Sequence, residues 1–453
     1  MATVDSDLPV DSRPAADRSH TLYQRARAVM PGGNSRITVF SRPWPLYALT
    51  GRGARITDVE GVERIDFLNN NTTLIHGHAH PEILAAITAA AARGTCYGGM
   101  PTELEVELAE AVCARNVTFE HIRFMNSGTE AVMMAVQAAR AHTGRPKIAT
   151  CRGAYHGNYD AVTVGQTGYH VVGADGTADD RPDFAGTPES VRANTVVIPF
   201  NDPTGAVRIL QQHAANLACV LVDPLPYRAG LVPATTEFLQ ALRDFCVRSG
   251  ALLVADEVSS FRVGYHGAMA RVGFQADLTV LGKIIGGGMP IGAVAGRREV
   301  MTVFDPSDGK PAVPHAGAFN ANPISMAAGL ASLRLLPRPE YDRINDLGEL
   351  ARTLLRDAVT AAGLDCQITG MASLFRVRPG TAAAGDRLAP GSVSPEDLMQ
   401  LLYQALLRNG ILLGSNGLGC ISTVMSGEDV ERLGIAFEHS LRDTMDKAAA
   451  SRG

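Results

Sequence analysis

Between residues 101 and 330, short apolar runs alternate with segments whose apolar residues recur every three or four positions. The apolar runs are residues 122–125, 196–199, 218–222, 251–255 and 278–281. Runs of this length are typical of strands buried on both faces. The helical patterns between them include 130–143 and 236–249. This alternation predicts an α/β fold with a mostly parallel central sheet.

After residue 330 the pattern changes. Three helical stretches are expected at 344–363, 395–409 and 427–447. They flank two weak strands at 374–377 and 411–413. The pattern predicts a smaller C-terminal α/β domain at 331–453, beside a large domain at 101–330. We expect residues 21–100 to pack with the small domain, and residues 1–20 to form a loose lead-in.

Composition narrows the class of protein. The chain has 453 residues, of which 46% are hydrophobic and 19% charged, which excludes wholesale disorder. Its net charge of −5 gives no basic excess for nucleic acid, and no apolar run reaches the roughly 18 residues of a membrane span. The N-terminus lacks the form of a signal peptide, and the seven cysteines are widely spaced. We therefore expect a cytoplasmic protein with reduced thiols.

A candidate phosphate site follows the first strand of the predicted large domain. Ser127 and Glu130 have the spacing of a capping box at a helix start. Gly128 and Thr129 lie between them, so backbone N–H groups and hydroxyls gather at one helix N-terminus. Such a place binds phosphate well, although a plain capped surface helix has the same sequence pattern.

Two aspartates are predicted at the carboxyl ends of neighbouring strands. Asp256 follows the run 251–255, and Asp223 follows 218–222. Open α/β sheets bind their ligands at these ends. A buried carboxylate needs a partner, which is either a protonated ring nitrogen of a cofactor or a structural salt bridge, for example with Arg262.

Lysine is scarce in this chain, with four lysines among 41 basic residues. Only Lys283 is framed by apolar residues and followed by three glycines. Burial lowers the pKa of a lysine and frees its amine for Schiff-base chemistry. Tyr155 offers an aromatic face for a flat ring, although a core tyrosine is the simpler interpretation of its tetrapeptide. A phosphate cradle, a carboxylate, an aromatic ring and a buried lysine are together what pyridoxal phosphate requires.

From about residue 23 to 441 the sequence resembles the class III aminotransferases. These are fold-type I enzymes that use pyridoxal phosphate and work as homodimers. Within that family the chain is most similar to glutamate-1-semialdehyde 2,1-aminomutase and to β-amino-acid aminotransferases of the β-phenylalanine type. The segments that carry the resemblance are 30–36, 101–110, 126–131, 155–157, 256–258, 281–288, 319–323 and 326–329.

The resemblance implies a set of cofactor-binding residues, which are Ser127, Gly128, Thr129, Tyr155, Asp256, Val258 and Lys283. Lys283 would form the Schiff base and carry the proton, as the catalytic residue. Asp256 would keep the pyridine nitrogen protonated, while Tyr155 and Val258 would enclose the ring. The remaining three residues would hold the phosphate.

The resemblance also implies that Arg36 binds the substrate carboxylate, for which a guanidinium fork is well suited. Three departures from the family pattern stand beside this. Ala318 replaces a threonine that reaches the phosphate of the neighbouring subunit, and Asp223 replaces a glutamate that lines the pocket. Asn416 stands where β-amino-acid aminotransferases carry an arginine that helps to bind a 2-oxo acid, which weakens the case for 2-oxoglutarate as acceptor.

We expect amino transfer from a carboxylate-bearing amino acid, such as a β-amino acid, to an oxo acid. An intramolecular amino shift and racemisation stay open, because the same cofactor supports them. A distant alternative is a metal-dependent hydrolase that uses His76, His78 and His80, three imidazoles at alternate positions. A Gly-His-x-His-Pro turn without metal explains the same residues.

Overall fold

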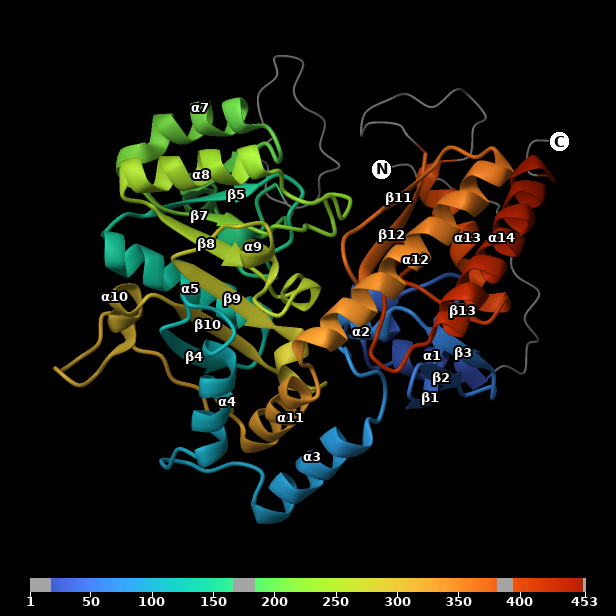
Figure 1. The fold of residues 1–453 in the computed structure, drawn as a ribbon, viewed down its shortest axis with the longest axis horizontal. Helices are drawn as coiled ribbons and strands as arrows, with labels where there is room; N and C mark the ends of the chain where they lie inside the picture. Colours follow the sequence, from blue (N-terminus) through green and yellow to red (C-terminus); the bar gives the residue numbers. More distant parts are fainter. Residues whose placement is uncertain (1–17, 166–183, 381–393, 451–453) are drawn as a thin grey trace.

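The computed structural model describes residues 18–165, 184–380 and 394–450. The chain forms one part around a wide sheet and a second part around two small sheets (Figure 1). Most of the predicted N-terminal lead-in lies outside the described residues. The described chain enters with helix α1 (Arg18–Arg27).

The wide sheet has seven strands. In spatial order they are β4 (His121–Met125), β10 (Gly292–Gly296), β9 (Leu278–Gly282), β8 (Leu252–Asp256), β7 (Leu217–Val222), β5 (Lys147–Cys151) and β6 (Thr195–Ile198). Only β10 runs antiparallel to its neighbours, and the pairs from β9 to β6 are all parallel. The predicted α/β fold with a mostly parallel central sheet is confirmed.

Helices cover both faces of this sheet, namely α5 (Gly128–Thr143), α7 (Pro203–His213) and α8 (Thr236–Ser249). In strand β8, Leu252 and Val254 pack into the hydrophobic core beneath α5. Leu253 and Ala255 point the other way, into the core beneath α7 and α8, which lie together in Figure 1. Both faces are therefore apolar, which explains why the strands read as continuous apolar runs.

Strand β10 is an element that the sequence pattern did not predict. Its residues are only glycine, alanine and valine, and glycine and alanine are poor strand formers. The glycine at its start is required by packing, because a Cβ on Gly292 would lie 2.0 Å from the carbonyl oxygen of Ser127. A close approach between backbones, which is invisible in the sequence, thus dictates this strand.

The second part of the molecule combines N-terminal and C-terminal segments. Its strands are β1 (Ala48–Arg52), β2 (Arg55–Asp58), β3 (Glu63–Asp66) and β13 (Ile411–Leu412) in one sheet, and β11 (Cys366–Thr369), β12 (Leu374–Pro379) and β14 (Leu418–Cys420) in the other. Its helices are α12 (Arg338–Ala362), α13 (Pro395–Arg408) and α14 (Gly427–Ala450). Strand β13 pairs in parallel with β3, so segments from both ends of the chain share one sheet.

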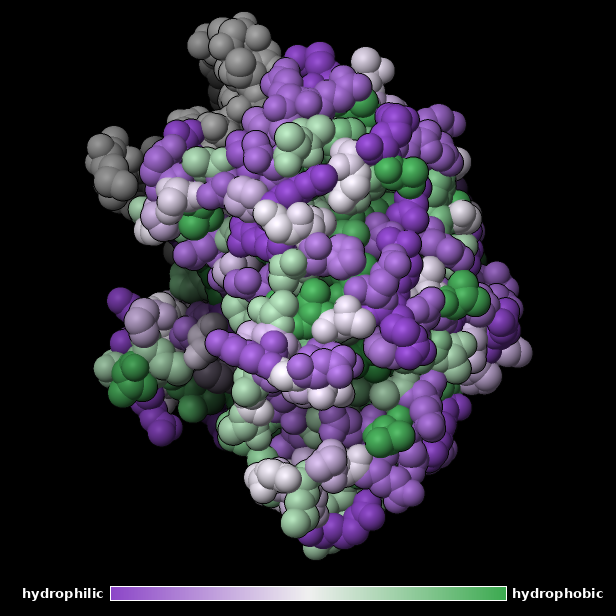
Figure 2. Space-filling view, turned by 90° about the vertical axis from the view of Figure 1, so that its left-hand side faces the viewer, coloured by the Kyte–Doolittle hydropathy of each residue, from purple (hydrophilic) through white to green (hydrophobic). Residues whose placement is uncertain are grey.

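The remaining helices are α2 (Asn69–Thr72), α3 (Pro81–Arg93), α4 (Glu103–Cys113), α6 (Glu189–Arg192), α9 (Ala268–Arg271), α10 (Arg298–Met301) and α11 (Pro323–Arg334). Helix α11 packs against both α3 and α4. On the face drawn in Figure 2, apolar residues lie in small separate groups among polar ones. Within the described ranges, no helix combines the length and the apolar character needed to cross a membrane.

A fully buried arginine joins the two parts of the molecule. Arg262 follows strand β8, and its guanidinium donates hydrogen bonds to the Thr72 carbonyl oxygen at 2.9 Å and to the Ser373 hydroxyl at 3.1 Å. It also donates to the carbonyl oxygen of Ile421. Its partners come from the N-terminal and the C-terminal segments, so one side chain ties both to the wide sheet.

Replacing this arginine by methionine is expected to destabilise the whole molecule. Arg262→Met leaves buried acceptors unpaired, at about 1–3 kcal/mol for each. We expect the free energy of unfolding to fall by at least about 3 kcal/mol, measured by urea denaturation. Arg248→Met, on the exposed side of α8, is the matched control and should change it by less than about 0.5 kcal/mol. Equal stability of the two variants would contradict the joining role of Arg262.

Candidate active site

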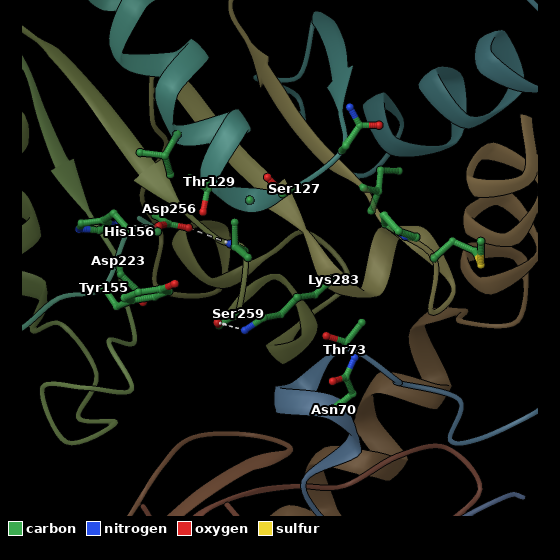
Figure 3. Close-up of a pocket in the computed structure, with 18 of the residues that line it drawn as sticks. Asn70, Thr73, Ser127, Thr129, Tyr155, His156, Asp223, Asp256, Ser259 and Lys283 are labelled. Carbon is green, nitrogen blue, oxygen red and sulfur yellow. Dashed lines mark hydrogen bonds and ion pairs between the residues drawn. The ribbon is translucent and has the colours of Figure 1, made fainter. Parts of the chain in front are cut away.

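A cavity of about 360 Å³ opens at the carboxyl ends of β7, β8 and β9 and at the start of α5. All seven residues predicted to bind the cofactor line it. Figure 3 shows Ser127 and Thr129 on one side and Tyr155, His156, Asp223 and Asp256 on another, with Asn70 and Thr73 opposite. The structure thus brings together residues from six separate segments of the chain.

The start of α5 has the predicted capping box. The Ser127 hydroxyl accepts a hydrogen bond from the Glu130 N–H at 3.1 Å, and the Glu130 carboxylate accepts one from the Asn126 N–H at 2.7 Å. Gly128 is tightly placed, because a Cβ there would lie 3.1 Å from the Val258 side chain. The helix N-terminus therefore faces the cavity with its first backbone N–H groups, which is an arrangement that favours an anion.

Asp256 ends strand β8 and is held by a histidine. Its Oδ2 lies 2.7 Å from Nδ1 of His156, and its Oδ1 accepts a hydrogen bond from the Val258 N–H at 3.1 Å. Asp256 and His156 are both buried. The suggested salt bridge between Asp256 and Arg262 is wrong, because Arg262 is engaged with carbonyl oxygens and Ser373.

The amine of Lys283 is surrounded by polar groups. Nζ donates to the Ser259 hydroxyl at 2.5 Å and reaches that of Thr72 at 3.4 Å. The residue keeps some exposure toward the cavity, while its amine is enclosed by protein. Burial lowers the pKa of Lys283 to about 8, against the opposing charges of Asp256 and Asp223. At pH 7 about a tenth of the amine is then neutral, far more than for a lysine with the ordinary pKa of 10.5, and nucleophilic chemistry requires this neutral form.

Two further carboxylates lie beside Asp256. Burial raises the pKa of Asp223, and the nearby charge of Asp256 raises it further. Asp223 lines the cavity and accepts a hydrogen bond from the Leu225 N–H at 2.9 Å. Burial also raises the pKa of Glu257 to about 7, but this side chain accepts from the first N–H groups of α9, and it is not part of the cavity wall. Asp223 is thus the carboxyl group of this pair that can hold a proton at the cavity.

Arg36 reaches the cavity through an asparagine. Its Nη1 donates to Oδ1 of Asn70 at 2.8 Å, and Asn70 lines the cavity. Asn70 belongs to α2, whose four residues Asn69–Thr72 all have positive φ, from 47° to 71°. Left-handed backbone costs about 1–2 kcal/mol per residue, and asparagine tolerates it better than most residues. The run of three asparagines was a signal for this turn that our sequence analysis missed.

His156, Ser259 and Asn70 are site residues that sequence reasoning did not single out. His156 stands next to Tyr155, but nothing local marks it as the partner of Asp256, a hundred residues away. Ser259 follows Val258 directly, and only the fold shows that it meets Lys283. These contacts depend on how distant strands are arranged.

The structure argues against the metal alternative. Nδ1 of His76 lies 2.9 Å from the Thr423 hydroxyl, and its Nε2 lies 2.9 Å from the Ser332 carbonyl oxygen. His78 is paired with a carboxylate, 2.7 Å away, and His80 stands at the start of α3. Among the residues that the structure describes, no group of three or more His, Cys, Asp or Glu could hold a metal ion. The three histidines are structural, and the metal-dependent hydrolase interpretation is wrong.

Of the three departures from the family pattern, Asp223 lines the cavity, whereas Ala318 and Asn416 lie away from its wall. The backbone oxygen of Ala318 accepts a hydrogen bond from Cys96 at 3.2 Å, and both residues are exposed. Asn416 caps a turn through its own side chain, and its carbonyl oxygen accepts from Arg376. Neither residue lines the cavity.

Comparison with known proteins agrees with this geometry. Residues 39–421 match the model of the family described as aminotransferase class-III. Glutamate-1-semialdehyde 2,1-aminomutase of Ignicoccus hospitalis is 38% identical over 91% of this chain and 96% of its own length.

Solved structures show the same similarity. A transaminase with PLP (pyridoxal phosphate) bound is 57% identical, with a TM-score of 0.89, and the match covers 96% of this chain and 99% of that one. A β-phenylalanine aminotransferase from Variovorax paradoxus is 36% identical, with a TM-score of 0.82 and 92% of each chain covered.

The residues around the cavity fit pyridoxal phosphate. The open N–H groups of α5 suit its phosphate, and the Tyr155 ring suits its aromatic ring. The buried pair of His156 and Asp256 offers a carboxylate for a protonated ring nitrogen, and Lys283 offers a neutral amine for its aldehyde. The phosphate, the aromatic ring, the ring nitrogen and the aldehyde of the cofactor therefore each have a chemical partner in the cavity.

The lowered pKa of Lys283 predicts a pH dependence. The amine must be neutral to attack an aldehyde, so coupling is slow where Lys283 is protonated. We expect the rate at which the apo-protein couples excess pyridoxal phosphate, followed by visible absorbance, to rise with pH toward a plateau, with its midpoint at about pH 8. Because the Asp256 charge raises this pKa, Asp256→Asn should move the midpoint to lower pH. Lys283→Ala controls for other amines, and a midpoint near the ordinary lysine value of 10.5 would contradict the prediction.

Proposed function

The chain belongs to the class III aminotransferases, enzymes that depend on pyridoxal phosphate, and from this premise we propose that it transfers the amino group of a carboxylate-bearing amino acid to an oxo acid. One observation carries the proposal. Lys283, whose pKa is lowered, follows strand β9, and the buried aspartates Asp256 and Asp223 lie at the ends of the adjacent strands β8 and β7, so that all three line one cavity.

Bound pyridoxal phosphate supplies an electrophilic carbon that takes up an amino group and a conjugated ring that accepts negative charge. Asp256, fixed by His156, holds a proton on the ring nitrogen and so keeps the ring electron-poor. The first residues of α5 hold the phosphate, while Tyr155 and Val258 enclose the ring between them. Asp223, at the cavity wall, takes up a proton more readily than an exposed aspartate, because its pKa is raised.

Lys283 moves the proton at the substrate carbon. Its Nζ is held by the Ser259 hydroxyl, which keeps the amine at a fixed place within the cavity. A pKa of about 8 allows Nζ to take up a proton from carbon and to return it at another atom near neutral pH. These two steps complete the proton transfer without a further base, and release of the oxo acid then consumes one molecule of water.

Arg36 selects substrates that carry a carboxylate. Its guanidinium is exposed and is oriented by Asn70 at the edge of the cavity. A guanidinium binds a carboxylate through two parallel hydrogen bonds. The similarity to a β-phenylalanine aminotransferase supports a β-amino acid as the amino donor.

An intramolecular amino shift is a second candidate. The similarity to glutamate-1-semialdehyde 2,1-aminomutase favours it, since that relative matches along 91% of this chain. Both reactions use the same lysine and the same aspartates. They differ in the fate of the amino donor. In amino transfer, the donor leaves its amino group on the cofactor and departs as an oxo acid, whereas in the intramolecular shift the amino group returns to the same molecule.

We also propose that the enzyme is a homodimer in the cytoplasm. Large apolar side chains are exposed on three separate segments of the chain: Ile37 at 86%, Met100 at 77% and Phe319 at 63% of full exposure. A second copy that covers them would remove this area from water. All seven cysteines are free, which fits a reducing compartment.

Absorbance spectroscopy of the holoenzyme tests the function. We expect an amino acid donor, added without any oxo acid, to convert the visible cofactor band into that of the amino form, with release of one equivalent of oxo acid. Lys283→Ala should reduce this conversion by several orders of magnitude, because it removes the amine that moves the proton at the substrate carbon. An aminomutase would instead restore the original visible band of the cofactor and release no oxo acid. Conversion at the wild-type rate in Lys283→Ala would contradict the assigned role.

Substitution of Arg36 tests the choice of substrate. Arg36→Ala should raise KM for carboxylate-bearing donors by about 10- to 100-fold, the scale of hydrogen bonds to a charged group, and should leave simple amines almost unchanged. Asn70→Ala should act in the same direction but less strongly, since it removes only the orienting contact. Arg25→Ala, on the exposed side of α1, serves as the control. An equal effect of Arg36→Ala on acids and amines would remove it from the carboxylate role.

A further inference from the structure

A second arginine contacts the wall of the cavity. The guanidinium carbon of Arg228 lies 4.2 Å from the centre of the Tyr155 ring, and Tyr155 lines the cavity. Arg228 is exposed and forms no ion pair with a carboxylate within the described part of the chain. Arg36, which contacts Asn70 at another part of the cavity lining, likewise is exposed and forms no ion pair with a carboxylate among the described residues. Among the described residues, two cations without acidic partners therefore contact side chains that line one cavity, and they come from different segments.

The backbone of Arg228 is firmly anchored. It lies in the loop after β7, where the Leu231 N–H donates to the Pro226 carbonyl oxygen at 3.0 Å. Arg376 of β12 donates to the carbonyl oxygen of Tyr227 and, at 3.5 Å, to that of Arg228 itself. The loop is thus fixed to the second part of the molecule, while the Arg228 side chain lies over the ring of Tyr155, which lines the cavity.

The contact with Tyr155 covers only the planar face of the guanidinium, and the Tyr227 hydroxyl accepts a hydrogen bond from its edge. A guanidinium that stacks on a ring uses its planar face, whereas its five N–H groups point outward in the plane. A stacked arginine is therefore already ordered and loses little freedom when its edge binds a planar carboxylate. The neighbouring Tyr227 packs against the edge of Tyr155, with ring centres 5.9 Å apart, and limits the movement of this ring.

The same region contains the position where the sequence lacks an expected arginine. Arg376 donates from Nε to the carbonyl oxygen of Asn416 at 3.1 Å, and the same side chain holds the loop of Arg228. Asn416 and the Arg228 loop are therefore neighbours on either side of Arg376. The loop of Asn416 lacks the expected arginine, whereas the neighbouring loop carries Arg228.

We propose that Arg228 is a specificity-determining residue that binds a second carboxylate, at the end of the substrate away from the reacting carbon. This rests on the proposed aminotransferase function and adds the class of acceptor, which is a dicarboxylic 2-oxo acid. Arg36 and Arg228 then hold the two carboxylates of one extended molecule. A monocarboxylic 2-oxo acid leaves one of the two arginines without a partner.

Kinetics with two acceptors tests the proposal. With one amino donor, the wild-type enzyme should use 2-oxoglutarate with a higher kcat/KM than pyruvate. Arg228→Met retains volume but removes the charge and the N–H groups. It should lower kcat/KM for 2-oxoglutarate by about 10-fold, mainly through KM, and that for pyruvate by less than about twofold. Arg228→Lys should recover part of the loss, and Arg208→Met, at an exposed position of α7, should change neither acceptor.

Three results separate the outcomes. Equal loss for both acceptors would overturn the proposal and would place Arg228 with Tyr155 in holding the cofactor, which the cofactor absorbance of the variant would show independently. A wild-type enzyme that uses pyruvate as well as 2-oxoglutarate would also overturn it. The half-reaction with the amino donor contains no acceptor, so failure of that half-reaction would contradict the aminotransferase function itself. If the half-reaction succeeds but Arg228→Met leaves the preference between acceptors unchanged, only the role of Arg228 is refuted.

Discussion

Lys283 lies in one cavity with two buried carboxyl groups, those of Asp223 and Asp256. The electrostatic interaction of the amine with these two groups constrains the rest of the site. The three residues stand at the ends of β7, β8 and β9, which are adjacent and parallel, so the sheet itself brings them together. Burial makes each charge costly, and the costs appear as a lowered pKa for the lysine and a raised pKa for Asp223. The polar partners around them, above all His156 and Ser259, are what make this arrangement tolerable.

The lysine is also connected to the far ends of the chain. Thr72 reaches Nζ with its hydroxyl, and its carbonyl oxygen accepts a hydrogen bond from the buried Arg262. Arg262 in turn binds Ser373 and Ile421. One left-handed turn therefore positions Asn70 for Arg36 and couples the active lysine to the second part of the molecule. The strain of that turn is concentrated where the substrate is proposed to bind, as is common at functional sites.

The two arginines at the rim illustrate how a family site is modified. Arg36 is the arginine that the resemblance to the family assigns to a substrate carboxylate, whereas Arg228 belongs to the loop after Asp223, where the sequence departs from the family pattern. The loop is held by Arg376 rather than by its own sequence. Changes of specificity of this kind need only a new side chain on an anchored backbone, because the catalytic lysine and aspartates stay in place.

The sequence by itself determined the features that depend on neighbouring residues. Apolar runs located the strands, the Ser127–Glu130 spacing located the capped helix, and the strand ends located Asp256 and Lys283. Only the tertiary structure decided which distant groups meet. It paired Asp256 with His156 rather than with Arg262, and it placed β10 between β9 and β4. It also brought Arg228 to Tyr155. The physical reason is that caps and strand ends follow from local backbone geometry, whereas buried polar partners are chosen by contacts between segments that lie tens to hundreds of residues apart.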